Sequence, residues 1–382
     1  MRSPSGERNR QDARAATNPS LRSSWRPWRP GGQSLRGVSL RASLPAASLL
    51  AVSLVLQACG GAEPTPQSPP PPPPSAPAPE PSAAPEPVAS PDLLAGIKAF
   101  DAGHYADARA SFEAAAKKNP HDSGALYNLG MACEKLGDAA AAEAAYKAAL
   151  VAAPDLETAS AELCALYLDQ GRIDDALAVG RAGLAAHPGS AVLHENVGVA
   201  LATRGDTDAA TTELGQAVHI APSEPMFHLT LAHWLNVWHT RGAAAQLDAV
   251  LGLVKGDYAM TASVGYEYRM AGEFASCVKT FDAAIATKDG GEVRTERALC
   301  HLGQKDEAGA LDDLQAAVKA EPTYAPAHYY LGGRLASSKH FKEAAAQYAE
   351  YLKLAPTGSL AKAAAERLKA AQQAARKGPA AK

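Results

Sequence analysis

Two stretches of the chain carry residue types that could do chemistry, and the first begins at His194. His194 and Glu195 start like an HExxH motif, in which two histidines four residues apart bind zinc and the glutamate acts as a general base. The position of the second histidine is held by Gly198. The sequence therefore excludes a zinc protease of this type here.

The second stretch gathers three histidines and two tryptophans within twelve residues: His228, His233, Trp234, Trp238 and His239. No two of these histidines stand four residues apart, the spacing that places two metal ligands on one face of a helix. We therefore interpret the cluster as core and interface aromatics and predict no metal site. A metal-dependent sensor or enzyme that uses these histidines is the alternative function.

Other catalytic signatures are missing from the sequence. The chain contains neither a glycine-rich phosphate loop nor a GxSxG elbow around a nucleophilic serine. We predict that the protein is not an enzyme and that it uses no cofactor.

The charge of the chain is divided unevenly. The formal net charge of the 382 residues is −3, but residues 1–59 contain nine arginines and only two acidic residues, Glu7 and Asp12. That segment therefore carries +7, which leaves −10 for the remainder. An acidic mature chain makes nucleic acid an unsuitable partner.

Residues 1–58 are predicted to be a signal peptide. Arg36 and Arg41 precede an apolar run, residues 46–56, that is too short to span a membrane as a permanent helix. The following Leu-Gln-Ala-Cys sequence resembles a bacterial lipobox, which implies that Cys59 is lipidated and becomes the new N-terminus. An ordinary secretory signal is the alternative.

Two neighbouring features refine this prediction. The arginine-rich stretch before Arg36 is long for a signal peptide, so we expect translation to start later than Met1, near Val38. Gly60 is not the aspartate that retains many such lipoproteins at the inner membrane. The resemblance therefore implies an anchor in the outer membrane.

Residues 59–91 change to proline, alanine, serine and glutamate, with six consecutive prolines from Pro69 to Pro74. Such a composition cannot form a packed core and favours polyproline II. We predict a disordered, semi-rigid linker after the lipidated Cys59. A ligand for a proline-binding domain is the alternative.

The rest of the chain is organised by one repeated unit, which is clearest in residues 123–154. Apolar residues recur there at helical spacing, a glycine interrupts the pattern, and a second helical pattern ends at a proline. The unit resembles a tetratricopeptide repeat, whose pattern is a large residue, Leu-Gly, a turn glycine, alanine, an aromatic residue, alanine and a closing proline. The matching residues are Leu126, Leu129, Gly130, Gly137, Ala142, Tyr146, Ala149 and Pro154.

Closing prolines recur 34 residues apart at Pro120, Pro154, Pro188 and Pro222, and again at Pro322 and Pro356. The resemblance and this fixed step predict an all-α fold: a right-handed solenoid of about eight helix-turn-helix repeats over residues 92–356. An amphipathic helix at about 359–374 is expected to cap the solenoid, within a cap and tail that span 357–382.

The pattern is weakest where no closing proline occurs. The fifth repeat, from Pro225 to about Gly256, should have a longer first helix and a displaced second one. In the seventh repeat the turn glycine is expected at Gly303, two places early.

The cysteines other than Cys59 are predicted to be small buried residues rather than disulfides. Cys164 and Cys277 fall on small-residue packing positions, and Cys133 falls on a core position. Cys133 and Cys164 are the one pair that the repeat pattern brings close.

In this family the first helix of each repeat lines a concave groove, and the resemblance implies which residues lie there. The predicted partner-binding residues are Tyr127, Met131, Met226, Leu229, His233, Tyr266, Met270 and Tyr329. Methionine and tyrosine suit an adaptable groove for an extended or helical segment of another protein. The alternative is that some of these residues are packing residues.

The expected function is a scaffold that is lipid-anchored in the bacterial outer membrane, faces the periplasm and gathers envelope proteins in this groove.

Overall fold

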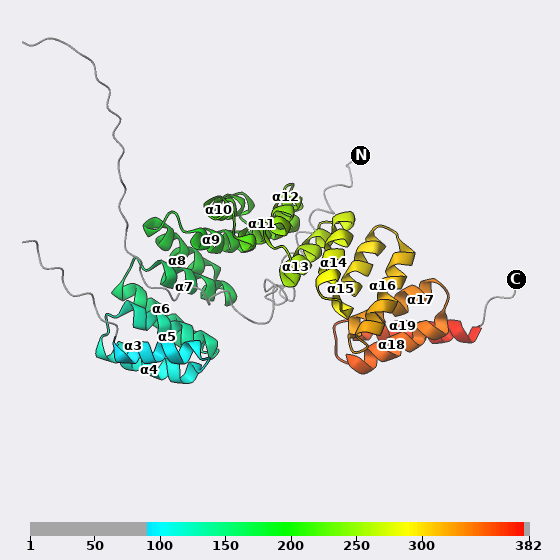
Figure 1. Cartoon of the computed structure of the whole chain (residues 1–382), viewed down its shortest axis with the longest axis horizontal. Coiled ribbons are helices and arrows are strands. Elements are labelled where there is room, and N and C mark those ends of the chain that lie inside the picture. Colours follow the sequence, from blue (N-terminus) through cyan, green and yellow to red (C-terminus); the bar gives the residue numbers. More distant parts are fainter. Residues whose placement is uncertain (1–89, 378–382) are drawn as a thin grey trace, which may run out of the picture. The chain divides into compact units, whose positions relative to one another are not determined.

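The computed structural model describes residues 90–377, and in that part of the chain every regular element is an α-helix. Figure 1 shows these helices following one another as antiparallel pairs. The first four pairs, repeats 1 to 4, are α3 (Pro91–Asp101) and α4 (Tyr105–Lys118), α5 (Ser123–Lys135) and α6 (Ala139–Ala152), α7 (Glu157–Asp169) and α8 (Ile173–Ala186), and α9 (Ala191–Arg204) and α10 (Thr207–Ile220).

Repeats 5 to 8 are α11 (Pro225–Val237) and α12 (Ala243–Leu253), α13 (Tyr258–Met270) and α14 (Phe274–Thr287), α15 (Gly291–Gly303) and α16 (Glu307–Ala320), and α17 (Ala325–Ser337) and α18 (Phe341–Leu354). A last helix, α19 (Ala361–Lys377), packs on α18. The prediction of an all-α solenoid of eight helix pairs with a capping helix is confirmed.

The predicted signal peptide, the predicted lipidation site Cys59 and nearly all of the predicted linker lie outside the described residues. The last residue of that linker already belongs to the first helix, and the residue before it caps that helix. Pro91 is the first residue of α3, and the hydroxyl of Ser90 accepts a hydrogen bond from the Leu93 amide as a helix cap. Within residues 90–377, no helix has the length and apolar character needed to cross a membrane.

A small residue in the first helix of a repeat makes room for a large one in the second. A Cβ on Gly130 would lie 2.4 Å from the ring of Tyr146, and one on Gly265 would lie 2.7 Å from the ring of Phe281. Such distances are far below van der Waals contact, so only glycine lets the two helices approach this closely. In repeat 3 the glycine is in the second helix: a Cβ on Gly180 would lie 2.6 Å from Val197 of the next repeat and 3.2 Å from Sγ of Cys164.

The turn inside each repeat requires one residue in the left-handed region. Gly137, at φ +77°, is typical of repeats 1 to 4 and 6, where glycine takes this conformation without a steric cost. His239, Lys305 and Lys339 hold the same place in repeats 5, 7 and 8, at φ of +53°, +65° and +65°. The turn geometry is therefore kept even where the sequence lacks the favoured residue.

The prediction of the turn residue in repeat 7 is wrong. Lys305, not Gly303, is the left-handed turn residue. Gly303 is small for a different reason, because a Cβ there would lie 2.3 Å from the ring of Phe274 in the preceding repeat. It is a packing glycine at the junction of two repeats.

Repeat 5 departs from the others in its second helix. The prediction of a longer first helix is wrong, since α11 has 13 residues like α5 and α13. The displaced second helix is confirmed: α12 starts only at Ala243 and has 11 residues, where other second helices have 14. A turn with two left-handed residues, His239 and Gly242, takes up the difference.

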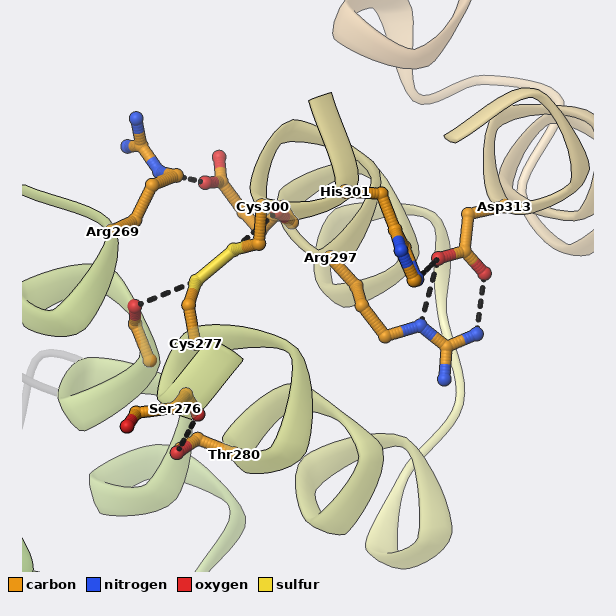
Figure 2. Close-up of a disulfide and its surroundings, with 10 residues drawn as sticks. Arg269, Ser276, Cys277, Thr280, Arg297, Cys300, His301 and Asp313 are labelled. Carbon is orange, nitrogen blue, oxygen red and sulfur yellow. Dashed lines mark hydrogen bonds and ion pairs between the residues drawn. A yellow bond between two sulfur atoms is a disulfide. The ribbon is translucent and has the colours of Figure 1, made fainter. Parts of the chain in front are cut away.

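The cysteine prediction is partly wrong. Cys277 of α14 and Cys300 of α15 form a disulfide whose Cα atoms are 6.0 Å apart, whereas Cys133 and Cys164 are free and buried. The repeat pattern located Cys277 within its own repeat and did not show that α15 of the next repeat places Cys300 against it. Figure 2 shows this bond, which joins repeats 6 and 7 covalently.

Candidate functional site

The first helices of repeats 5 and 6 meet through polar side chains that include one predicted groove residue. Nδ1 of His233 on α11 lies 2.8 Å from Oε1 of Glu267 on α13. The amide nitrogen of Asn236 donates to the other oxygen of the same carboxylate, at 3.0 Å, and to the Glu267 backbone carbonyl, at 3.1 Å. Glu267 therefore ties α11 to α13.

The first helices of repeats 6 and 7 meet in a similar way. The hydroxyl of Tyr266 on α13 donates to Oε1 of Glu292 on α15 at 2.8 Å, and Nε of Arg269 pairs with Oε2 of Glu296 at 2.9 Å. The Glu296 side chain is only 14% exposed. Burial raises its pKa above the usual range for glutamate, and the Arg269 guanidinium opposes that shift.

Tyr266 stays a hydrogen-bond donor in this setting. Burial raises the pKa of its hydroxyl well above the ordinary value, and the nearby carboxylates Glu296 and Glu292 raise it further. The tyrosine is therefore neutral and holds α15 in place through a directed hydrogen bond.

The most accessible predicted groove residues lie on α11 and α13. Met226, Leu229 and His233 follow one another at helical spacing on α11, and all three side chains are partly exposed. Met270, the last residue of α13, is 66% exposed. We call these four residues and Tyr266 the central strip.

Two of the three other predicted residues offer little surface. Met131 and Tyr329 are only 8% and 6% exposed, and both belong to hydrophobic core clusters. The Arg367 guanidinium of α19 also lies over the Tyr329 ring, 4.9 Å from its centre. Tyr127 is half-buried, with its ring centre 5.9 Å from that of Tyr146. We therefore base the proposed binding surface on the central strip.

The histidines that suggested metal chemistry take part in packing. In repeats 4, 5 and 8 a histidine six residues after the closing proline places Nε2 against that proline's carbonyl oxygen, at 2.9–3.0 Å, and Nδ1 against a side-chain oxygen of the second helix, at 2.6–2.7 Å. The three histidines are His194, His228 and His328, and their second-helix partners are Glu213, Gln246 and Gln347. Each one ties its repeat to the preceding turn.

The tryptophans of repeat 5 also join repeats. Trp234 and Trp238 stack with ring centres 5.6 Å apart, and Trp234 packs against core clusters on both sides, one centred on repeats 2 to 4 and one on repeats 5 to 7. Between residues 90 and 377, no group of three or more histidine, cysteine, aspartate and glutamate side chains is arranged to hold a metal ion.

Sequence reasoning missed the carboxylates of the strip. Glu267, Glu292 and Glu296 occupy three different positions along their helices, so the repeat pattern does not mark them. A search for carboxylates on each first helix that could face polar groove residues of the preceding repeat would have found them.

A second buried polar cluster lies in repeat 7. Asp313 of α16, whose side chain is 5% exposed, accepts a hydrogen bond from Nε of Arg297 at 2.7 Å and a second one from Nη2 of the same guanidinium. Figure 2 shows this pair, with the His301 ring beside it. Because Asp282 of α14 also pairs with Arg297, at 2.5 Å, the cluster binds repeat 7 to repeat 6.

Comparison with known proteins identifies the repeat. The family model described as a tetratricopeptide repeat matches residues 93–157 and 166–225. No curated protein matches the chain.

Solved structures with similar folds were also found. Yeast Tom70 is 15% identical, with a TM-score of 0.49 over 75% of this chain and 64% of its own, so this chain spans just under two thirds of that protein. A tetratricopeptide repeat protein from Parabacteroides merdae is 17% identical, with a TM-score of 0.46 over 65% of this chain and 98% of its own. MamA from Desulfovibrio magneticus is 22% identical, with a TM-score of 0.40 over 44% of this chain and 98% of its own.

The family model covers the first four repeats, and the same helix pair continues through the eighth. Residues 93–157 and 166–225 therefore match the tetratricopeptide repeat family, and the later repeats continue the same helix-pair fold.

Proposed function

We propose that the protein is a lipid-anchored scaffold of the bacterial outer membrane, which faces the periplasm and binds envelope proteins through its central strip. Repeats of this family support protein-protein interaction. The observation that carries the proposal is the central strip, where exposed Met270 and partly exposed His233 and Leu229 are offered by helices that Glu267 and Glu292 hold in place. Adaptable side chains on a fixed backbone suit binding of another chain.

The disulfide supports the compartment that we propose. Disulfides persist in oxidising compartments such as the periplasm and are rare in the cytosol. The Cys277–Cys300 bond lies in the folded part of the chain, whereas the signal peptide and Cys59 are inferred from sequence alone. These two lines of support are independent of each other.

The alternative of a metal-dependent sensor or enzyme has no observation in its favour. His228 and His233, which would have supplied ligands, are engaged with Gln246, the Pro222 carbonyl and Glu267. We therefore put forward the scaffold alone.

Site-specific crosslinking tests the binding surface. A photoreactive residue replaces Met270, and a second variant carries it at Val151, which is 81% exposed at the end of α6. We expect discrete protein adducts in the intact envelope from position 270 and none from position 151. Changing Tyr127, Met226 and Tyr266 together should remove these adducts while the helical circular dichroism is unchanged. Adducts that persist through the triple change would show that the binding surface is wrongly assigned.

Membrane fractionation tests the anchor separately. Mass spectrometry of the mature wild-type protein should find a lipidated Cys59 at the N-terminus, and Cys59→Ala should release the protein from the outer-membrane fraction. A mature protein that begins at Met1 would contradict both the signal peptide and the anchor.

A further inference from the structure

Repeat 8 and the capping helix border an open cavity of about 520 Å³. One wall is α17, with Gly333 and Ala336, and the facing wall is α19, with Ala370 and Ala374. Phe341 of α18 adds an aromatic side chain to the lining. Ligand pockets of proteins measure roughly 300–1,000 Å³ and are mostly apolar with a few polar groups. The cavity is therefore large enough for one or two bulky apolar side chains.

The cavity exists because repeat 8 has small residues where the central strip has large ones. Gly333 is the ninth residue of its helix, the place of His233 in α11 and Tyr266 in α13. Ser337 is the thirteenth, the place of Met270 in α13. The same face of the first helix that presents side chains in repeats 5 and 6 is hollow in repeat 8.

Packing of the fold does not require this glycine. A Cβ on Gly333 would find its nearest neighbours, Nη1 of Arg367 and the hydroxyl oxygen of Tyr348, at 3.7 Å, an ordinary contact distance. By contrast, a Cβ on the adjacent Gly332 would come within 3.0 Å of the Tyr348 ring. Gly332 therefore allows the close contact between α17 and α18, whereas Gly333 leaves space in the cavity.

Two guanidinium groups line the same cavity. Arg334 of α17 is paired with Glu307, but none of the carboxylates in residues 90–377 forms an ion pair with Arg367, which lies over the Tyr329 ring. The lining therefore carries one arginine without a carboxylate partner among the described residues. A guanidinium pairs well with a carboxylate, because its fork of N–H donors matches the two oxygens.

We propose that this cavity anchors a protein segment in which a large apolar residue stands next to an aspartate or glutamate. The apolar side chain enters between α17 and α19, and the neighbouring carboxylate pairs with Arg367. The proposal rests on the scaffold function above and names the chemistry of the partner. A protein segment is the expected occupant because the cavity occupies the helix positions that form the central strip in repeats 5 and 6, and so continues that binding face.

Selection from a random dodecapeptide library displayed on phage tests the proposal with the full-length protein. Enriched peptides are then synthesised with a fluorescent label and titrated by anisotropy. We expect the enriched sequences to contain Leu, Phe, Trp or Met beside Asp or Glu. Gly333→Leu fills the cavity and should weaken binding at least tenfold.

Two further variants sharpen the result. Gly215→Leu on α10 is the matched control, because a Cβ there meets nothing within 4 Å and lies away from the cavity. It should bind like the wild type. Arg367→Gln, a change of an exposed side chain, should also weaken binding at least tenfold, and replacing the peptide's acidic residue by its amide should then cost nothing more. This variant keeps the test valid if Gly333→Leu alters the fold.

Three results would overturn the inference: no enrichment above background, enriched peptides without an acidic residue, or equal binding to wild type, Gly333→Leu and Arg367→Gln. Peptides whose binding is lost only in the variant changed at Met226 and Tyr266 would place the ligand on the central strip. That outcome would refute the cavity site while it supports the proposed scaffold.

Discussion

Repeats 1 to 4 and repeats 5 to 7 reach the same helix-pair geometry by different means. The first four have a turn glycine such as Gly137 in every repeat and a closing proline 34 residues after the last. Repeats 5 and 6 lack the closing proline, and repeats 5 and 7 place His239 and Lys305 in the left-handed turn.

Side chains hold the second region together where backbone signals are missing. Within it, the Cys277–Cys300 disulfide joins repeats 6 and 7, and the nearly buried Asp313 ties the two helices of repeat 7 together through Arg297. The ion pair between Arg109 and Asp138, which joins repeats 1 and 2, is 35% and 40% exposed and so contributes little to stability. The comparison indicates that specific side-chain contacts between helices can replace the turn glycine and the closing proline. The residues that make these contacts cannot then be changed freely.

The largest expected effect concerns Asp313. Asp313→Asn leaves the mostly buried Arg297 without its innermost partner and should lower the free energy of unfolding by about 3–5 kcal/mol. Asp282→Asn, which removes a 56% exposed partner of the same arginine, should cost below about 1 kcal/mol. Urea unfolding followed by circular dichroism measures both. Equal losses would show that the buried pair is no more important than a surface one.

Reduction of the disulfide comes next. Opening a cross-link between residues 23 apart should lower stability by about 2–4 kcal/mol, because the unfolded chain gains freedom. Thermal unfolding with and without a dithiol measures the loss. The double variant Cys277→Ala, Cys300→Ala should not respond to the reductant, whereas Cys133→Ala should respond like the wild type. A wild-type midpoint that reductant leaves unchanged would contradict the role of the bond.

A packing glycine tests the first region. Gly130→Ala places a methyl group 2.4 Å from the Tyr146 ring and should destabilise the protein by about 1–3 kcal/mol. Gly124→Ala in the same helix meets its nearest neighbour at 3.4 Å and should be neutral or stabilising by up to about 1 kcal/mol, since alanine favours the helix. Denaturant midpoints distinguish the two, and similar midpoints would argue against a tight helix contact at Gly130.

The smallest effect concerns the turns. Lys339→Gly relieves a non-glycine residue at φ +65° and should stabilise the protein by about 0.5–1 kcal/mol. Gly137→Lys, the reverse change in repeat 2, should destabilise it by a similar amount. Thermal midpoints of the two variants should move in opposite directions, and shifts of the same sign would refute the equivalence of the two turns.

The fold was predictable because its determinants are local. Each repeat from the first to the fourth closes with a proline that follows the end of its second helix: Pro120, Pro154, Pro188 and Pro222. The alternation of apolar and small residues between these prolines decides which helix faces meet. The site was less predictable. His233 and Tyr266 were found by their place in the repeat, but their partners Glu267 and Glu292 come from neighbouring repeats. A pattern read within one unit does not show which side chains of the next unit it meets.

The number, order and spacing of the helix pairs thus follow from short-range signals along the chain. Packing between repeats decided the rest: the pairing of Cys277 with Cys300 rather than Cys133 with Cys164, the burial of Tyr329 under Arg367, and the cavity beside Gly333. The physical reason is that a helix boundary depends on a few adjacent residues. A contact, a buried charge or a cavity depends on the volumes and directions of side chains that only the stacked helices bring together.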